Sequence, residues 1–201
     1  MLYYLITGLS LGLSSGLSPG PLFALVIYQT LNYGSKEGVK VAITPLITDI
    51  PIILFSYFII NLFASSRIMY GILSLSGGLF IAWLAYESFK MKEIKTVNMP
   101  RSQSVRKGVI TNLLNPAPYM FWITVGIPTV LKGYTTSIVH ALLFVVPFYM
   151  CLVGSKITLA VLVGRSGKVN PRILRYINIV LGIVLAALAV KFIYDGIGYF
   201  R

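Results

Sequence analysis

Ionisable residues are scarce in this chain of 201 residues, and their scarcity excludes several classes of protein. Only 11% of the residues are charged, whereas a typical soluble domain has about 25%. The chain has five acidic residues, one histidine and one cysteine, Cys151. A single cysteine excludes an internal disulfide and a two-cysteine redox relay. The sequence also lacks a metal-binding cluster, a P-loop and a well-placed Ser-His-Asp set, so we expect no metal, no cofactor and no enzymatic activity.

Hydrophobic residues make up 57% of the chain and gather in six long apolar segments. Each segment is near or above the ~20 residues that a helix needs to cross the core of a bilayer. The first begins without a positively charged region or a clear cleavage site, so we interpret it as a retained span and not as a signal peptide. The sequence therefore predicts an all-α integral membrane protein with six transmembrane helices. These spans are expected at residues 2–31, 39–63, 68–90, 108–131, 136–164 and 172–198.

The net charge of +12 arises from 17 basic residues, most of which lie in three short gaps between the apolar segments. Nucleic-acid binding is not indicated, because a nucleic-acid-binding protein carries its basic surface on a soluble fold. Basic residues favour the cytoplasmic side of a membrane. We therefore expect these gaps in the cytoplasm, both termini outside, and the protein in the plasma membrane. The most basic gap, 91–107, would link two three-helix halves, 1–90 and 108–201, of a single membrane domain, 1–201.

The first apolar segment contains two features that a plain transmembrane helix does not need. Gly8, Gly12 and Gly16 recur every four residues, and such a stripe of small residues lets a second helix pack closely in lipid. The motif Ser-Pro-Gly-Pro at residues 18–21 then removes two backbone N–H donors, so a straight helix cannot pass through it. We predict a broken helix here, which at membrane depth must be packed by protein or line a polar cavity. A simple kink in a packed helix is the alternative.

A second proline motif occupies the corresponding place in the fourth apolar segment, where Asn115 is followed by Pro116 and Pro118. Each half has an odd number of spans, so the second half must enter the membrane upside down relative to the first. Inverted halves with matching proline-interrupted helices are typical of secondary transporters, which bind their solute between the halves. The sequence therefore predicts two inverted three-helix repeats, with helices one and four broken at the proline motifs.

Asp49 and Lys156 are charged residues that lie well inside apolar segments. Asp49 is about ten residues into the second segment and Lys156 about eight residues from the end of the fifth, or roughly 15 and 12 Å of helix. Charged residues at this depth are costly and indicate function by default. We expect the two to meet, with Asp49 accepting a proton or a substrate amine and Lys156 as its switchable partner. A static ion pair is the alternative, and Lys156 by itself could extend to the interface.

Other polar and aromatic residues have less demanding interpretations. Asn115 could bond the carbonyl groups freed by the prolines or contact the substrate. Glu87 is expected in a surface pair with Lys90, and Trp83 as an anchor at the membrane interface. The predicted substrate- or ion-binding residues are Ser18, Pro19, Gly20, Pro21, Asp49, Asn112, Asn115, Pro116 and Lys156, and the predicted helix-packing residues are Gly8, Gly12 and Gly16.

These motifs resemble those of the LysE/RhtB family of amino-acid exporters. The shared pattern is G-x-x-x-G-x-x-P-G-P at residues 12–21, an aspartate in the second span, Asp49, and K-G-x-x-x-N-x-x-N-P at residues 107–116. Size and number of spans agree too, so the resemblance covers essentially the whole chain. The family typically continues the second motif with a lysine, and this chain has Ala117 there. The resemblance implies export of amino acids or related small polar metabolites, coupled to proton entry.

We therefore expect a secondary transporter in which the half-helix after Pro21 turns its N-terminus toward a substrate carboxylate, while Asp49 holds the ammonium group or a counter-moving proton. Its partners would be a small-molecule substrate and membrane lipids, and the glycine stripe also allows a homodimer. Two alternatives stay open. One is an exporter of an ion or another small solute from the same superfamily, and the other is a non-transporting scaffold subunit that dimerises through the stripe.

Overall fold

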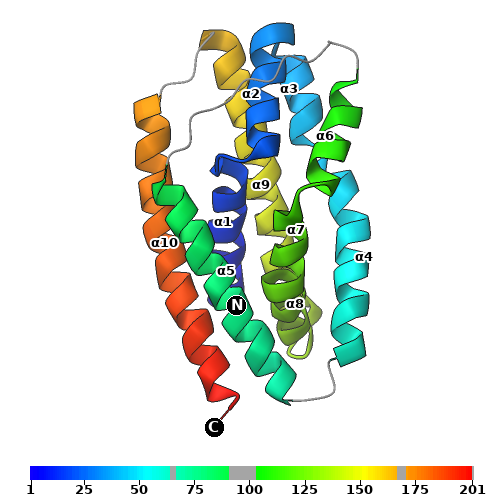
Figure 1. The fold of residues 1–201 in the computed structure, drawn as a ribbon, viewed down its shortest axis with the longest axis vertical. Helices are drawn as coiled ribbons and strands as arrows, with labels where there is room; N and C mark the ends of the chain where they lie inside the picture. Colours follow the sequence, from blue (N-terminus) through cyan, green and yellow to red (C-terminus); the bar gives the residue numbers. More distant parts are fainter. Residues whose placement is uncertain (64–66, 91–102, 167–170, 201) are drawn as a thin grey trace.

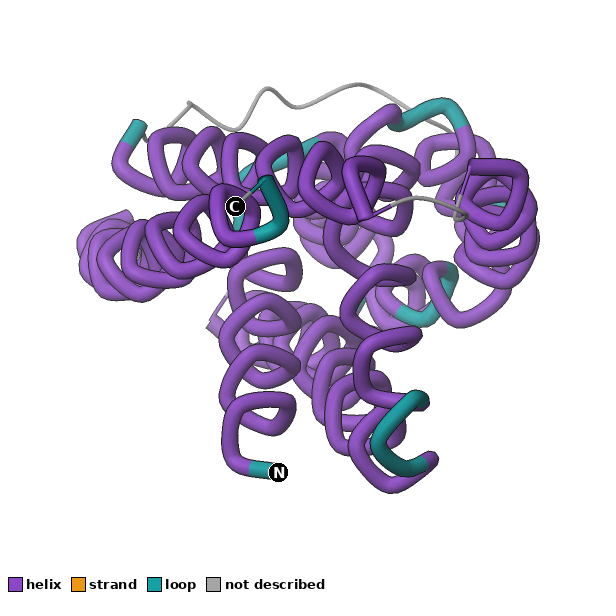
Figure 2. Tube along the Cα trace, turned by 90° about the horizontal axis from the view of Figure 1, so that it is seen from below, coloured by secondary structure: helices purple, strands orange, loops and turns teal. Residues whose placement is uncertain are grey.

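The computed structural model describes residues 1–63, 67–90, 103–166 and 171–200, and within these ranges the chain is helical, with no strand. The helices form one bundle with both termini in its lower half in Figure 1, and Figure 2 shows the bundle from that end. The all-α prediction is confirmed. The elements are α1 (Leu2–Leu17), α2 (Pro21–Tyr33), α3 (Ser35–Ala42), α4 (Pro45–Phe63), α5 (Arg67–Phe89), α6 (Ser104–Leu113), α7 (Pro116–Phe121), η1 (Trp122–Gly126), α8 (Ile127–Tyr134), α9 (Ile138–Ser166) and α10 (Pro171–Gly198).

Four helical stretches of the described chain are long and apolar enough to cross a membrane, or five when α1 and α2 are counted as one bent span. The predicted fourth span, 108–131, is not among them because it is divided among α6, α7, η1 and α8. This is a multi-pass membrane protein, but the predicted fourth span is not a continuous helix. Most of the predicted basic linker, residues 91–102, lies outside the described residues. The four stretches that are each long and apolar enough to cross a membrane are Ser35–Ile60, Gly71–Phe89, Ile138–Ser166 and Arg175–Gly198.

The break predicted in the first span is present. α1 ends at Leu17, α2 begins at Pro21, and the two helices are bent by 57° relative to each other. The extended backbone of Ser18, with φ −65° and ψ 129°, ends α1. Pro21 is the first residue of α2, a position where a backbone N–H has no partner in the helix, so its absence costs nothing. The Pro-Gly-Pro motif thus ends one helix and starts the next in a new direction.

The second proline motif also starts a helix. α7 begins at Pro116 directly after Asn115, whose backbone is extended. α7 continues into η1, a π-helical segment over Trp122–Gly126, and then into α8. A Cβ atom on Gly126 would overlap the indole ring of Trp122, so glycine makes room for this ring against the π turn. Single π-helical turns are rare and occur frequently at functional sites.

The glycine stripe of α1 packs against α9. A Cβ atom on Gly8 would overlap the carbonyl oxygen of Phe144, and one on Gly12 would overlap that of Phe148. Gly16 lies against the same helix one turn further on. The backbones of α1 and α9 therefore approach as closely as glycine permits. Because α9 occupies the stripe, it is not an open face for a homodimer, and the scaffold alternative loses the surface on which it relied.

Gly12→Ala is expected to lower the thermal stability of the protein, because the added methyl group must displace the α9 backbone at Phe148. Overpacking of this kind costs about 1–3 kcal/mol. The matched control is Gly154→Ala in α9, where a Cβ atom has no neighbour within 4 Å. Thermal unfolding of the two variants in detergent checks the prediction. Equal unfolding temperatures would contradict the close approach of α1 and α9.

Aromatic side chains fill the centre of the bundle. Phe121 and Phe148 stack with their ring centroids 4.9 Å apart, and Trp122 lies edge-on to Phe148 with centroids 5.7 Å apart. Leu11 of α1 and Ile81 of α5 are fully buried in the same cluster, so it joins helices of both halves of the chain. This aromatic cluster forms one wall of the cavity described below.

Candidate functional site

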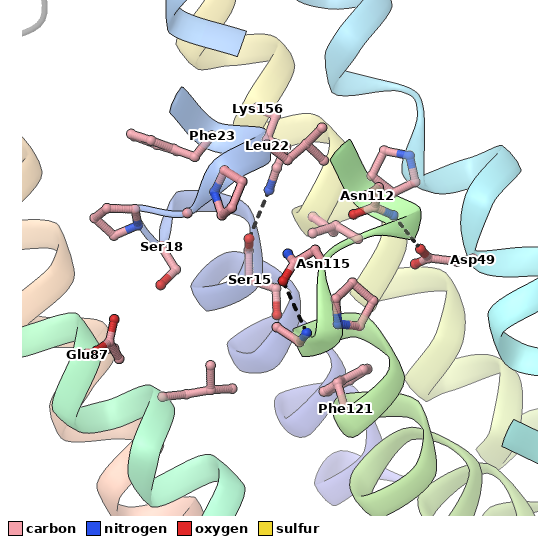
Figure 3. A pocket seen from close by; sticks show the side chains of 18 of the residues that line it. Ser15, Ser18, Leu22, Phe23, Asp49, Glu87, Asn112, Asn115, Phe121 and Lys156 are labelled. Carbon is pink, nitrogen blue, oxygen red and sulfur yellow. Dashed lines mark hydrogen bonds between the residues drawn. The ribbon is translucent and has the colours of Figure 1, made fainter. Parts of the chain in front are cut away.

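A cavity of about 270 Å³ lies where the break between α1 and α2 meets α4, α5, α7, η1 and α9 (Figure 3). This volume is just below the ~300–1,000 Å³ of pockets for drug-sized ligands, so the cavity suits a smaller solute. Pro116 is exposed and does not line it, and every other predicted binding residue does. The predicted residues that line the cavity are Ser18, Pro19, Gly20, Pro21, Asp49, Asn112, Asn115 and Lys156.

Asp49 of α4 is held in place by two neighbouring side chains, and the residue is only 4% exposed. Its Oδ1 accepts a hydrogen bond from Nδ2 of Asn112 at 3.0 Å, and its Oδ2 accepts one from the Tyr149 hydroxyl at 3.0 Å. The same Asn112 amide donates to the Thr48 hydroxyl at 2.6 Å, which fixes its orientation. A carboxylate offers about four acceptor positions. Asp49 therefore has a fixed position and keeps acceptor capacity for a ligand in the cavity.

Lys156 of α9 lines the same cavity as Asp49 but forms no ion pair with it, so the static ion pair given as the alternative is wrong for these two described residues. The lysine is 3% exposed, and its Nζ donates to the carbonyl oxygens of Ser15 at 2.8 Å and Gly16 at 3.0 Å. These carbonyls belong to the last turn of α1, where a helix leaves its acceptors without partners. The lysine thus caps the end of the first half-helix (Figure 3), while still lining the cavity.

The start of α2 faces the cavity without a side-chain cap from any described residue. The N–H groups of a helix's first turn have no partner within the helix, so they are available to a ligand. A Cβ atom on Gly20 would have no neighbour within 4 Å, which shows that the space beside this helix start is open. α7 differs, because Oδ1 of Asn115 accepts a hydrogen bond from the backbone N–H of Ala117 at 3.1 Å. Asn115 therefore binds a backbone donor and not the carbonyl group that the first of its two interpretations required, and it lines the cavity, as the second requires.

The two buried charges make reciprocal contacts between the halves of the chain. Asp49, in the second predicted span, reaches Asn112 just before the break in the fourth. Lys156, in the fifth predicted span, reaches Ser15 and Gly16 just before the break in the first. Each half thus supplies one charged side chain that binds the broken helix of the other half. These contacts make the position of each broken helix dependent on the opposite half.

Glu87 and Trp83 of α5 also line the cavity, although the sequence predicted a surface position for Glu87 and an interfacial one for Trp83. They lie on one helical face with Phe80 and Leu84, two further lining residues, at the three- and four-residue spacing of neighbours on a helix. Figure 3 shows Glu87 on the α5 wall, away from Asp49. The spacing of these four residues was the sequence signal that they share one face. Their position near the end of a predicted span favoured an interfacial interpretation instead.

Comparison with known proteins agrees with the motifs. The model of the LysE type translocator family matches residues 13–196, a range that includes both breaks and both buried charges. Searches of curated proteins and of solved structures each gave no match. The matched range covers far more than half of the chain, and it contains every residue that lines the cavity. The chain therefore belongs to the LysE type translocator family.

Proposed function

We propose that this protein is a secondary transporter that exports an amino acid or a related small polar metabolite in exchange for protons. The observation that carries the proposal is the presence, in one small cavity, of a fixed carboxylate and two kinds of positive group. Asp49 is the carboxylate, and Lys156 and the uncapped start of α2 are the positive groups. An amino acid carries an ammonium and a carboxylate group, and such a cavity can bind both together.

The substrate carboxylate would bind at the start of α2, because first-turn N–H groups and the helix dipole both favour an anion there. Lys156 would support the same carboxylate. A lysine ammonium has three donors, and Nζ of Lys156 uses two of them for the carbonyl oxygens of Ser15 and Gly16. The third donor is available for the ligand. Lys156 in this proposal both fixes the broken helix and assists binding.

Asp49 would bind either the ammonium group of the substrate or a proton, one at a time. A buried carboxylate without a compensating charge is costly at membrane depth. The loaded transporter satisfies Asp49 with the ammonium group, and the returning transporter satisfies it with a proton from the outer side. A transporter that returned with Asp49 charged and unpaired would bear this cost. Exchange of substrate for a proton is therefore favoured.

We further propose that the chain forms six spans in two inverted halves, with helices one and four broken. The reciprocal contacts of Asp49 and Lys156 support this arrangement, because the second span of each half braces the broken helix of the other. α3, the start of α6 and the end of α9 carry basic residues and lie at the opposite end of the bundle from the termini (Figure 1). In the plasma membrane this end would be cytoplasmic and both termini would be outside.

Efflux from preloaded proteoliposomes tests the proposal. The common L-amino acids are loaded one at a time in radiolabelled form, and efflux is followed with and without an inwardly directed proton gradient, against protein-free liposomes. We expect one chemical class of amino acid to leave, at a rate that the gradient increases. An efflux rate that the proton gradient does not change would contradict proton coupling. If folded protein exports none of the amino acids tested, amino-acid export is refuted and an ion or another solute becomes the expected substrate.

A further inference from the structure

A second cavity, of about 340 Å³, lies toward the end of the bundle that carries both termini. Residues of α1, α5, η1, α8 and α10 line it, so both halves of the chain contribute. Lys132 of α8 and Asp195 of α10 are its charged residues, and the hydroxyl groups of Ser74 and Thr129 are among its polar groups. It shares no lining residue with the first cavity. Its lining thus combines both signs of charge with hydrogen-bonding groups.

The two cavities follow one another along the same two elements. α5 lines both, with Ser74 at the second cavity and Phe80 at the first, about 9 Å apart at helical rise. η1 also lines both, with Trp122 at the first cavity and Thr124 at the second. Between them Gly77 packs on η1, where a Cβ atom would meet the carbonyl oxygen of Thr124. A thin layer of protein therefore separates the two cavities.

Lys132 and Asp195 form a loose ion pair at the second cavity. Nζ and Oδ2 are 3.7 Å apart, longer than the 2.7–2.9 Å of a charge-assisted hydrogen bond. The two side chains are 55% and 29% exposed, and exposed pairs of this kind contribute little to stability. A solute that offers a carboxylate to Lys132 and an ammonium group to Asp195 can replace the pair at small cost. It then gains two charge-assisted contacts in place of one loose one.

We propose that this cavity is a second binding site for the transported zwitterion, at the terminus-bearing end of its path. The substrate carboxylate binds Lys132, the ammonium group binds Asp195, and the hydroxyl group of Ser74 faces the rest of the solute. Ser74 donates its own proton to the Phe192 carbonyl at 2.9 Å, so its oxygen is left to accept. This inference rests on the proposed function, because it takes the amino-acid class of the solute from the first cavity.

The test measures substrate affinity separately at the two faces of the membrane. The probe is the radiolabelled amino acid with the highest efflux from wild-type proteoliposomes, and exchange is followed in intact cells and in inverted membrane vesicles. Lys132→Met and Asp195→Asn remove the two charges in separate variants. Arg175→Met is the control, since it removes an exposed basic charge from α10 that does not line the cavity.

Both cavity variants are expected to raise KM about fivefold at the outer face, where the proposed topology puts the termini. KM at the cytoplasmic face should stay within about twofold. A fivefold change suits the loss of one exposed charge contact. The control should change neither value. An equal rise at both faces, no rise at either face, or the same rise in the control would overturn the second site while leaving the transporter proposal intact. Absence of exchange by the wild-type protein would instead refute the proposed function, and the second site with it.

Discussion

Asp49→Asn is expected to abolish the stimulation of efflux by a proton gradient and to slow efflux about 100-fold. The substitution preserves size and one acceptor oxygen, but it removes the charge that in the proposed mechanism binds the ammonium group and takes up the proton. Hydrogen bonds to a charged buried group contribute about 1.5–3 kcal/mol each, and 2.8 kcal/mol corresponds to a factor of about 100. Initial efflux rates with and without the gradient measure both effects.

The matched control for this variant is Glu37→Gln, which removes the same charge outside the first cavity. Glu37 of α3 is 17% exposed; it pairs with Lys40 at 2.7 Å and accepts a hydrogen bond from the Ser104 hydroxyl at 2.6 Å, for which glutamine keeps an acceptor oxygen. Its loss should leave gradient stimulation unchanged. If Asp49→Asn protein were folded and still exported its substrate with full gradient stimulation, the role assigned to Asp49 would be wrong. A loss of efflux in both Asp49→Asn and Glu37→Gln would indicate that transport depends on the overall acidic charge of the protein and not on Asp49 in particular.

Lys156→Met is expected to reduce both the thermal stability of the protein and its transport activity. Without the ammonium group, the carbonyl oxygens of Ser15 and Gly16 lose their donor at a buried helix end. An unsatisfied buried polar group costs about 1–3 kcal/mol. Lys156→Arg keeps a cationic donor and should recover part of both properties. Lys191→Met, an exposed change in α10, serves as the control for loss of a positive charge.

Thermal unfolding in detergent and efflux from liposomes separate the two roles of Lys156. If Lys156 acts by stabilising the end of α1, unfolding temperature and transport should fall together in Lys156→Met and recover together in Lys156→Arg. Transport lost at unchanged unfolding temperature would show that Lys156 acts on the substrate and not on the broken helix. Unchanged transport in Lys156→Met would remove the lysine from the site.

Features that depend on the chemistry of a few neighbouring residues could be predicted from the sequence. The break before Pro21 follows from missing N–H donors, and the choice of Asp49 follows from the cost of a charge in an apolar segment. The close packing of Gly12 follows from the four-residue spacing of small residues. In each case the physical cause lies within one helix, so no knowledge of the fold is needed.

Features that depend on the direction in which a side chain points could not be predicted in the same way. The depth of Lys156 in the membrane was clear, but its rotation about α9 was not, and the lysine faces the end of α1 instead of Asp49. Tyr149 lies two turns earlier on α9 and faces Asp49 through a hydroxyl that the apolar run gave no reason to single out. The π turn at Trp122 has no sequence signature comparable to a proline motif.

The thin layer between Gly77 and Thr124 has an electrical consequence. When water fills a cavity from each side, the membrane voltage falls mainly across the protein that separates them. The field then acts over about 9 Å of α5 and not over the ~30 Å of the hydrocarbon core. The proposed exchange of a neutral zwitterion for one proton would move one net charge, which is worth about 2.3 kcal/mol per 100 mV, as much as a pH difference of about 1.7 units. An inside-negative voltage would therefore drive export even without a pH difference.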